Sequence, residues 1–342
     1  MSARNNIPVH IPEAEIGRLD AAEDALLAPV RGDDSRRALP KIYFTKRPSR
    51  FVVKFSTALL TIAVCWTLIA WWPAWPIAVA AMVVNGLMYA HLVELQHECL
   101  HEHAFRSRRL NRLCGVVCGV FMLSSFWHYK HDHLRHHAFL GTAKNREFFN
   151  YRFRDLHRWF GFGFLIGVLH PGRYVTVGRD MVLSCLGLPI PGVARPLDAR
   201  RIRTEYRLIA MLIVAAVLVS VWTGSWLVVF AWVLPTLLVA EPTHFLIEMP
   251  EHFGLNTQSD PDVLTNTRTI TASRFAQWFT NYNNVHTAHH YHQGVPMAQV
   301  RSLHTLIADR IATVEDSYPS FYWKVLTGKI GYHDSDQTCM TR

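Results

Sequence analysis

The sequence predicts an all-α integral membrane protein with four transmembrane helices and a histidine-rich cytoplasmic domain. Hydrophobic residues make up 50% of the 342 residues and charged residues 18%, a balance that is unusual for a soluble enzyme of this length. Four apolar segments, paired in two hairpins, are candidates to cross a bilayer, and the chain contains 20 histidines. An aromatic content of 12% excludes a disordered chain, and six cysteines in so long a chain exclude a disulfide scaffold.

The N-terminal 50 residues are predicted to form a cytoplasmic tail. No apolar stretch lies in the first 25 residues, so we expect no cleaved signal peptide. The tail is polar and ends in a basic cluster of Arg36, Arg37, Lys41, Lys46, Arg47 and Arg50. We divide the rest of the chain into a membrane domain, residues 51–310, and a C-terminal cytoplasmic tail, residues 311–342.

The four predicted spans follow from apolar length. They are residues 51–72, 74–96, 208–222 and 226–249. The first contains one charge, Lys54, which is placed where its side chain can extend to the membrane interface. The connections 71–76 and 223–225 are short and uncharged, so each joins two spans into a hairpin.

The distribution of lysine and arginine predicts the orientation. Neither hairpin connection carries a basic residue, and the dense basic stretches fall on the other side, at 36–54, 106–112, 130–158 and 195–207. By the positive-inside rule, that side is cytoplasmic and holds both termini. The net charge of +9 fits such a face, and because aromatic residues do not interleave the basic stretches, we expect no nucleic-acid partner.

Two further apolar stretches, residues 113–126 and 159–169, are too short to cross about 30 Å of hydrocarbon. They are interpreted either as helices lying in the membrane interface or as core helices of the cytoplasmic domain. The sequence does not separate these two alternatives.

Histidines gather in three boxes, one H-x-x-x-H pair and two H-x-x-H-H triplets. The boxes are His97 and His101; His133, His136 and His137; and His286, His289 and His290. On a helix, positions i, i+3 and i+4 share one face, so the imidazoles of each box can converge. At this histidine content chance gives about 0.07 copies of the triplet pattern, whereas two occur.

The number of convergent imidazoles favours two metal ions, because a tetrahedral zinc site takes four ligands. Imidazole also binds iron, copper and nickel, so the ligand type alone does not identify the metal. The boxes lie where spans meet the cytoplasm, beside a hydrophobic interior able to hold an acyl chain. Removing hydrogen from an unactivated C–H bond needs a stronger oxidant than zinc-bound water, and iron with dioxygen provides one.

The three boxes, their order, the four-span pattern and the segment 281–292 resemble the membrane fatty acid desaturase family, whose superfamily also includes acyl hydroxylases and carotenoid-modifying oxygenases. The resemblance covers about residues 50–310. It implies a cytoplasmic di-iron site with two Fe ions, O2 as cosubstrate and the eight box histidines as ligands; we assign no catalytic residue beyond the metal ligands.

The resemblance also implies a further histidine ligand after the fourth span. We favour His252 over its rival His244. Pro250 is expected to end the span and so to free His252 to turn back over the metal site.

Polar residues close to the boxes are candidates to support the site. Asp132, Glu98 and Glu102 are candidates to bind the free ring nitrogen of a ligand imidazole. Asn281 and Asn284 are candidates to hold a metal-bound water.

Two Glu-x-x-His pairs, Glu94 with His97 and Glu241 with His244, match the signature of soluble ferritin-like di-iron bundles. That architecture would leave both H-x-x-H-H boxes without a role. Glu94, Glu241 and His244 are therefore interpreted as residues that surround the metal site or line a channel.

The reaction predicted by the resemblance is O2-dependent insertion of a double bond into an acyl chain, lipid-linked or thioester. The alternatives are a hydroxylase, a desaturase of a small secondary metabolite, and a non-catalytic membrane protein that binds or transports metal. His170-Pro171-Gly172 is similar to the haem-binding turn of cytochrome b5, but no haem-sized acidic domain surrounds it. We therefore expect a separate electron donor of the ferredoxin or cytochrome type.

Overall fold

The computed structural model describes residues 39–71, 74–149, 151 and 162–333. Most of the predicted N-terminal tail lies outside the described residues. The described chain is mostly helical, with two strands of two residues each, which confirms the predicted all-α fold class. Four of its helical segments are long and apolar enough to cross a membrane, as predicted.

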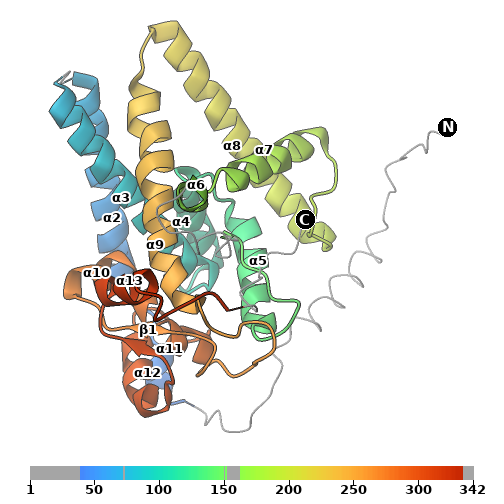
Figure 1. Cartoon of the computed structure of the whole chain (residues 1–342). Coiled ribbons are helices and arrows are strands. Elements are labelled where there is room, and N and C mark those ends of the chain that lie inside the picture. Colours follow the sequence, from blue (N-terminus) through green and yellow to red (C-terminus); the bar gives the residue numbers. More distant parts are fainter. Residues whose placement is uncertain (1–38, 72–73, 150, 152–161, 334–342) are drawn as a thin grey trace.

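The four long segments form two hairpins. The first pairs α2 (Pro48–Trp71) with α3 (Trp75–Leu100). In the second, α8 (Pro196–Thr223) is followed by a segment made of η3 (Val229–Val233), η4 (Thr236–Ala240) and α9 (Glu241–His252), and the two diverge away from their connection (Figure 1). Trp71 and Trp75, which flank the first connection, are the ends of α2 and α3 at the same end of the molecule as the connection between α8 and the fourth span (Figure 1).

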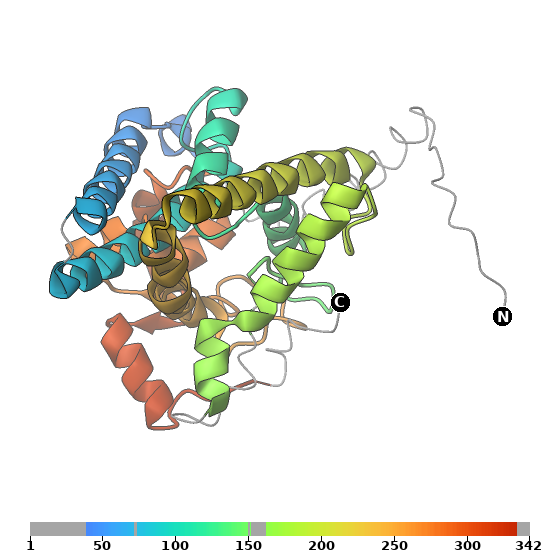
Figure 2. The ribbon, with the colours of Figure 1, turned by 90° about the horizontal axis from the view of Figure 1, so that it is seen from above.

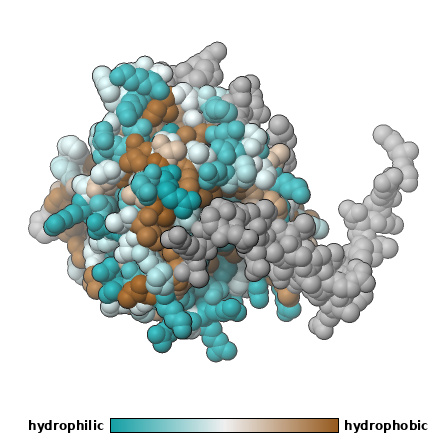
Figure 3. Space-filling view, turned by 90° about the horizontal axis from the view of Figure 1, so that it is seen from below, coloured by the Kyte–Doolittle hydropathy of each residue, from teal (hydrophilic) through white to brown (hydrophobic). Residues whose placement is uncertain are grey.

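The outer faces of these helices are apolar where lipid is expected to contact them. Trp71 and Trp75 are 82% and 76% exposed beside the first connection, and Trp222 and Trp226 are similarly exposed beside the second. The opposite end of the molecule presents a mixture of hydrophilic and hydrophobic residues (Figure 3). Exposed tryptophan at one level fits a membrane–water boundary.

Helix α8 begins at Pro196, twelve residues before the predicted span. Its first turns are charged, and carboxylates on it pair with arginines: Asp198 lies 3.6 Å from Arg195, and Glu205 lies 3.8 Å from Arg112. Hydropathy identifies only the part of a helix that faces lipid, so this ion-paired beginning was missed. Helix α7 (Pro171–Leu186) meets α8 in a V (Figure 2), and Val177, Ile202 and Tyr206 are buried where they pack.

The fourth span keeps its helical course although it contains prolines. Pro235 has no N–H to donate to the carbonyl of Ala231 four residues before it. The Tyr89 hydroxyl and the Asn85 amide, both on α3, donate to that carbonyl at 2.5 and 3.3 Å. A Cβ at Gly86 would lie 2.7 Å from the Pro235 carbonyl oxygen, so glycine permits this close approach of the two helices.

Pro250 does not end the span, contrary to our prediction, and α9 continues to His252. The carbonyl that Pro250 leaves without a helical donor is that of Leu246. The Tyr322 hydroxyl donates to it at 2.5 Å. A replacement partner from a distant segment therefore lets the helix run through the proline.

The two short apolar stretches form helices that pack on the rest of the fold. Helix α4 (Arg108–Val120) packs on α3, with Cys118 and Gly119 buried while Leu113 is 62% exposed. Helix α6 (Phe162–Leu169) contacts α9. Residues 159–161 of the second stretch lie outside the described residues.

The remaining elements cover the end opposite the hairpin connections (Figure 1). They are η1 (Lys41–Phe44), α5 (Phe126–Phe139), β1 (Thr269–Ile270), α10 (Arg274–Phe279), η5 (Asn283–Val285), α11 (His286–Tyr291), α12 (Val300–Ile307), η6 (Ala308–Arg310), β2 (Val314–Glu315) and α13 (Tyr318–Leu326). Strands β1 and β2 pair in parallel, Thr269 with Val314 and Ile270 with Glu315.

The segment expected as a C-terminal tail is partly folded onto the core. It supplies β2 and α13, and Phe321 of α13 is completely buried. The guanidinium of Arg268 lies 4.9 Å from the Phe321 ring. Sequence polarity alone did not reveal this packing, because α13 contributes few buried residues.

Candidate metal centre

The first histidine box lies at the end of α3. The helix is buried from Tyr89 to Leu100, and it ends as His101 becomes the cap residue. His97 and His101 are one turn apart and their rings lie 4.9 Å apart. The buried end of a long helix thus fixes both imidazoles.

The second box lies on α5, whose N-terminus is capped by Ser125, its hydroxyl accepting the His128 N–H. His133 and His137 are four residues apart and share one face. His136 precedes His137 by one residue, which is about 100° of rotation on a helix, so it points to a different place. One helix therefore serves two groups of ligands.

The third box lies on the short helix α11. Before it, Asn281 and Tyr282 both adopt left-handed backbone conformations, with φ of 49° and 68°. The Lys54 ammonium of α2 donates to Asn281 Oδ1 at 2.7 Å, and the Asn281 amide donates to Glu98 at 2.7 Å. These buried contacts hold a turn that is costly for residues other than glycine.

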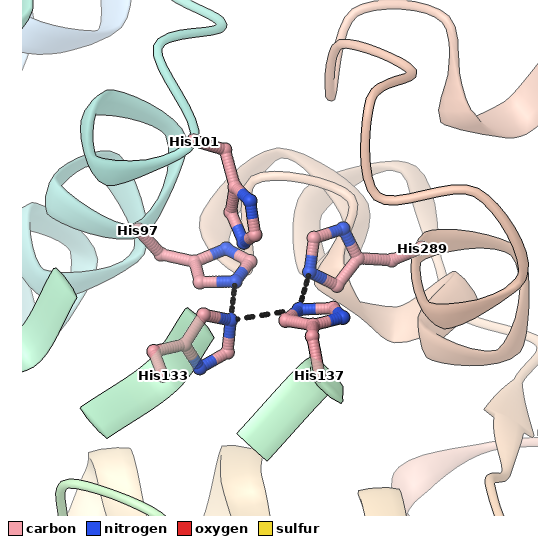
Figure 4. A group of neighbouring side chains, drawn as sticks. All are labelled: His97, His101, His133, His137 and His289. Atoms are coloured by element: carbon pink, nitrogen blue, oxygen red, sulfur yellow. Dashed lines mark hydrogen bonds between the residues drawn. The ribbon is translucent and has the colours of Figure 1, made fainter. Parts of the chain in front are cut away.

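The structure brings the three boxes and His252 together as two groups. In the first (Figure 4), His97, His101, His133, His137 and His289 converge. The second consists of His136, His252, His286 and His290. Within each group the nearest potential ligand atoms all lie within 4.8 Å of one another. His252 lies in the second group; His244 belongs to neither.

Hydrogen bonds at the outer ring nitrogens orient several of these imidazoles. The Nδ1 atoms of His133 and His136 lie 3.0 Å from Glu147 Oε2 and 2.8 Å from Asn145 Oδ1. The Nδ1 atoms of His286 and His252 lie 3.2 Å from Asn283 Oδ1 and 3.1 Å from the Asn266 carbonyl. Because these partners accept, each Nδ1 carries the proton and each Nε2 lone pair points inward.

The inward nitrogens are very close to one another. His97 Nε2 lies 2.8 Å from His133 Nε2, and His137 Nε2 lies 3.0 Å from both His133 Nε2 and His289 Nε2. Burial and neighbouring imidazoles lower the pKa of His137 well below its usual value, and burial lowers that of His289 in the same way. Neutral imidazoles with facing lone pairs are the donor set that a bound cation satisfies, so the residues present fit a metal ion in each group.

The predicted supporting residues lie mostly elsewhere. Glu98 contacts Asn281, and Glu102 lies 2.9 Å from Lys130 and 3.2 Å from Arg108. Asp132 contacts Arg146 and lies 3.8 Å from His128. Asn284, in η5, donates to the Ile270 carbonyl at 2.8 Å and so ties η5 to β1.

Sequence reasoning missed three residues that contact the box imidazoles, Asn145, Glu147 and Asn283. A fourth, Glu251, was expected only to accompany His252 back over the site. Asn283 also donates to Glu251 Oε1 at 2.6 Å, and Glu251 Oε2 lies 3.3 Å from His286 Nε2. Asn283 directly precedes Asn284, and Glu251 directly precedes His252; Asn284 and His252 were both predicted site residues. Glu147, ten residues after His137, offered only the weaker signal of a carboxylate directly before the apolar pair Phe148 and Phe149.

His244 belongs to a separate buried polar network. Its Nδ1 lies 3.0 Å from the Tyr151 hydroxyl, and its Nε2 lies 3.8 Å from Glu94 Oε1. Glu241 accepts from the Tyr174 hydroxyl at 2.7 Å and lies 3.7 Å from Arg173. Neither Glu-x-x-His pair therefore bridges the two histidine groups as carboxylates do in a ferritin-like bundle.

Comparisons with known proteins agree with this site. A family model described as "Fatty acid desaturase" matches residues 70–323. The chain is 26% identical over 152 residues to the "sn-2 acyl-lipid omega-3 desaturase (ferredoxin), chloroplastic" of Helianthus annuus, covering 42% of this chain and 34% of the relative. It is 28% identical over 122 residues to the "Acyl-lipid omega-3 desaturase (cytochrome b5), endoplasmic reticulum" of Arabidopsis thaliana, covering 35% and 31%.

A third relative, the "Delta(12)-fatty-acid desaturase" of Arabidopsis thaliana, is 28% identical over 123 residues, covering 34% of this chain and 28% of the relative. The chain thus spans about a third of the length of the curated relatives that it matches. The family model, by contrast, covers most of the chain and includes all three histidine boxes. The chain belongs to the fatty acid desaturase family.

Proposed function

We propose that this protein is a membrane-bound, O2-dependent desaturase that introduces a double bond into an acyl chain, either lipid-linked or thioester. The observation that carries the proposal is the convergence of nine buried or half-buried histidines into two groups beside four membrane-capable helices. Family membership supports oxidoreductase chemistry. The relatives named for acyl-lipid substrates support an acyl chain as the substrate.

In this proposal, each histidine group holds one iron ion. His97, His101, His133, His137 and His289 hold the first, and His136, His252, His286 and His290 hold the second. Two iron ions would supply the activation of O2, the cosubstrate, that removal of hydrogen from an unactivated carbon requires. The donor set also accepts other metals, so family membership is what selects iron.

The protein's own contribution is to orient ligands and exclude water. Asn145, Glu147 and Asn283 fix the ring orientation of histidines in both groups through Nδ1. Tyr129 is buried, lies 5.5 Å from the His133 ring and stacks on Phe148 at 5.1 Å. An aromatic wall of this kind keeps the site dry and limits side reactions with water.

Orientation and electron supply complete the proposal. By the positive-inside rule, the basic ends of the helices favour a cytoplasmic position for the metal site and both termini. Electrons come from a separate carrier of the ferredoxin or cytochrome type. The relatives whose names specify ferredoxin or cytochrome b5 support a carrier of this class.

The experiment is reconstitution of the purified, iron-loaded protein in bilayers with a ferredoxin or cytochrome b5 and its reductase. We expect O2-dependent appearance of fatty acids that are two mass units lighter, measured by gas chromatography and mass spectrometry of the lipid acyl chains. The His289→Ala variant is the control. A product sixteen mass units heavier would identify a hydroxylase instead, and O2-independent metal flux without any product would identify a transporter.

A further inference from the structure

A pocket of about 420 Å³ lies outside the metal centre, where α12 packs beside the chain that leads into α2 (Figure 1). Three arginines line it: Arg47 and Arg50 at the beginning of α2, and Arg301 on α12. Ser302 and Thr305, on the same helix as Arg301, also line the pocket and carry hydroxyl groups.

The three arginines line a common space, and the described part of the chain places no carboxylate among the residues that line it. Among the residues that the structure describes, none of the three has an ion pair with a carboxylate; Arg50 makes only a long contact, 3.4 Å, to the Ala298 carbonyl. Like charges gathered around one hollow repel each other, and a bound anion reverses that repulsion. Guanidinium groups bind phosphate through paired N–H donors, and hydroxyl groups can complete such a site.

The location of the pocket favours a lipid as the source of the anion. Val53 of α2 is 64% exposed on the apolar outer face of the first span. It follows Arg50 by three residues, which is about 4.5 Å along a helix. A phosphate in the pocket therefore lies at the depth where the headgroups of a bilayer meet its hydrocarbon.

The pocket is also connected to the third histidine box. Tyr282 lines it, and the Lys54 ammonium lies 4.6 Å from the Tyr282 ring. Tyr282 belongs to the left-handed turn that leads into α11, four residues before His286. Those residues form a 3₁₀ turn with a rise of about 2 Å per residue, so roughly 8 Å separates the pocket wall from the first ligand of that box.

From these observations we propose that the pocket binds the phosphate group of a membrane phospholipid and holds the headgroup of the lipid whose acyl chain is desaturated. The second part rests on the proposed function; the first does not. An acidic carrier protein is the rival occupant. A concave pocket of headgroup size favours a small group over a protein, because a stable protein interface buries about 800 Å² on each partner.

The test measures binding rather than turnover. Purified, iron-loaded, full-length protein in detergent is titrated calorimetrically with dioctanoyl phosphatidic acid, with dioctanoylglycerol as the same lipid without phosphate, and with inorganic phosphate. The variant is Arg50→Gln with Arg301→Gln. The matched control is Arg106→Gln with Arg109→Gln, which removes the same charge from exposed arginines outside the pocket.

We expect phosphatidic acid to bind more tightly than both other ligands. An exposed ion pair contributes up to about fivefold in affinity, and two such contributions multiply, so the double variant should bind phosphatidic acid up to about 25-fold more weakly. The control should bind like the wild type. Equal iron content and an equal thermal midpoint in both variants would show that the fold is intact.

Three results would overturn the proposal. The first is equal binding of phosphatidic acid by the wild type and the pocket variant. The second is binding of inorganic phosphate as tight as that of the lipid, which would assign the pocket to free phosphate. The third is unchanged lipid binding with slower reduction by ferredoxin, which would assign it to carrier docking. If the wild-type protein binds phosphatidic acid but desaturates no lipid, that result refutes only the proposed function.

Discussion

Glu147 is the carboxylate that links the two histidine groups, and its replacement gives the sharpest test of the metal centre. Its Oε2 lies 3.0 Å from Nδ1 of His133 in the first group and 3.7 Å from Nε2 of His136 in the second. Its Oε1 accepts the Phe148 N–H at 2.7 Å. In Glu147→Gln the amide oxygen keeps the hydrogen bond from the Phe148 N–H. The amide N–H₂ group then faces the Nδ1–H of His133. Two donors face each other there, whereas in the wild type the carboxylate accepts from Nδ1–H.

The expected size of the effect follows from the role of such partners. Loss of a hydrogen-bond partner behind a metal-ligating histidine typically weakens metal binding by about 10- to 100-fold, or roughly 1.4–2.7 kcal/mol. Glu147 holds Nδ1 of His133, whereas Nδ1 of His136 is held by Asn145, so we expect the iron of the first group to be lost at about 10- to 100-fold lower chelator concentration. The assay is iron content per chain by mass spectrometry after dialysis against a graded chelator series.

The matched control is Glu102→Gln, since Glu102 also lies beside a histidine box but pairs with Lys130 and Arg108. This variant should release iron at the same chelator concentration as the wild type. Identical release curves for Glu147→Gln and the wild type would refute the assignment of Glu147 as a supporting residue. Loss of both iron ions at the same chelator concentration would show that the second group also depends on Glu147.

Three further expectations concern ligands and topology. His289→Ala should abolish product formation while the protein still folds and inserts, whereas His333→Ala should be silent; near-normal turnover by the first variant would remove the third box from the ligand set. His252→Ala should lower iron content together with activity, whereas His244→Ala should retain iron and change activity or substrate choice, and metal analysis showing the reverse pattern would exchange the two assignments. A single cysteine in the turn 223–225 should react with an impermeant maleimide only from the non-cytoplasmic side, and labelling from the cytoplasmic side would contradict the proposed orientation.

The sequence was sufficient for the features that repeat along the chain. Apolar length predicted the four spans, and the helical spacing of the boxes identified eight histidines of the metal centre, because both depend on residues close in sequence. The expectation that each box converges as a unit was wrong for the second and third boxes, whose histidines divide between the two groups. Which histidines share a group depends on how α3, α5 and α11 pack. His136 and His137 are neighbours in sequence, yet their nitrogens belong to different groups.

Contacts between distant segments explain what could not be predicted. Pro250 was expected to end a helix because the rule for proline considers only local hydrogen bonds. The partner that lets the helix continue, Tyr322, lies 72 residues later. Glu147 was missed for the same reason, since nothing in its neighbourhood in sequence marks the fold that returns it to His133.

The two π-helical turns of the fourth span, η3 and η4, determine which way the side chains of α9 point. The N–H groups of Leu234 and Glu241 donate five residues back, to Val229 and Thr236, so each of these turns holds one residue more than an α-helical turn. One residue corresponds to about 100° of rotation about the axis of an α-helix. Deleting a single residue between 229 and 240 would therefore turn the whole of α9 by about a quarter revolution, carrying His252 away from the second histidine group without changing any residue of the metal centre.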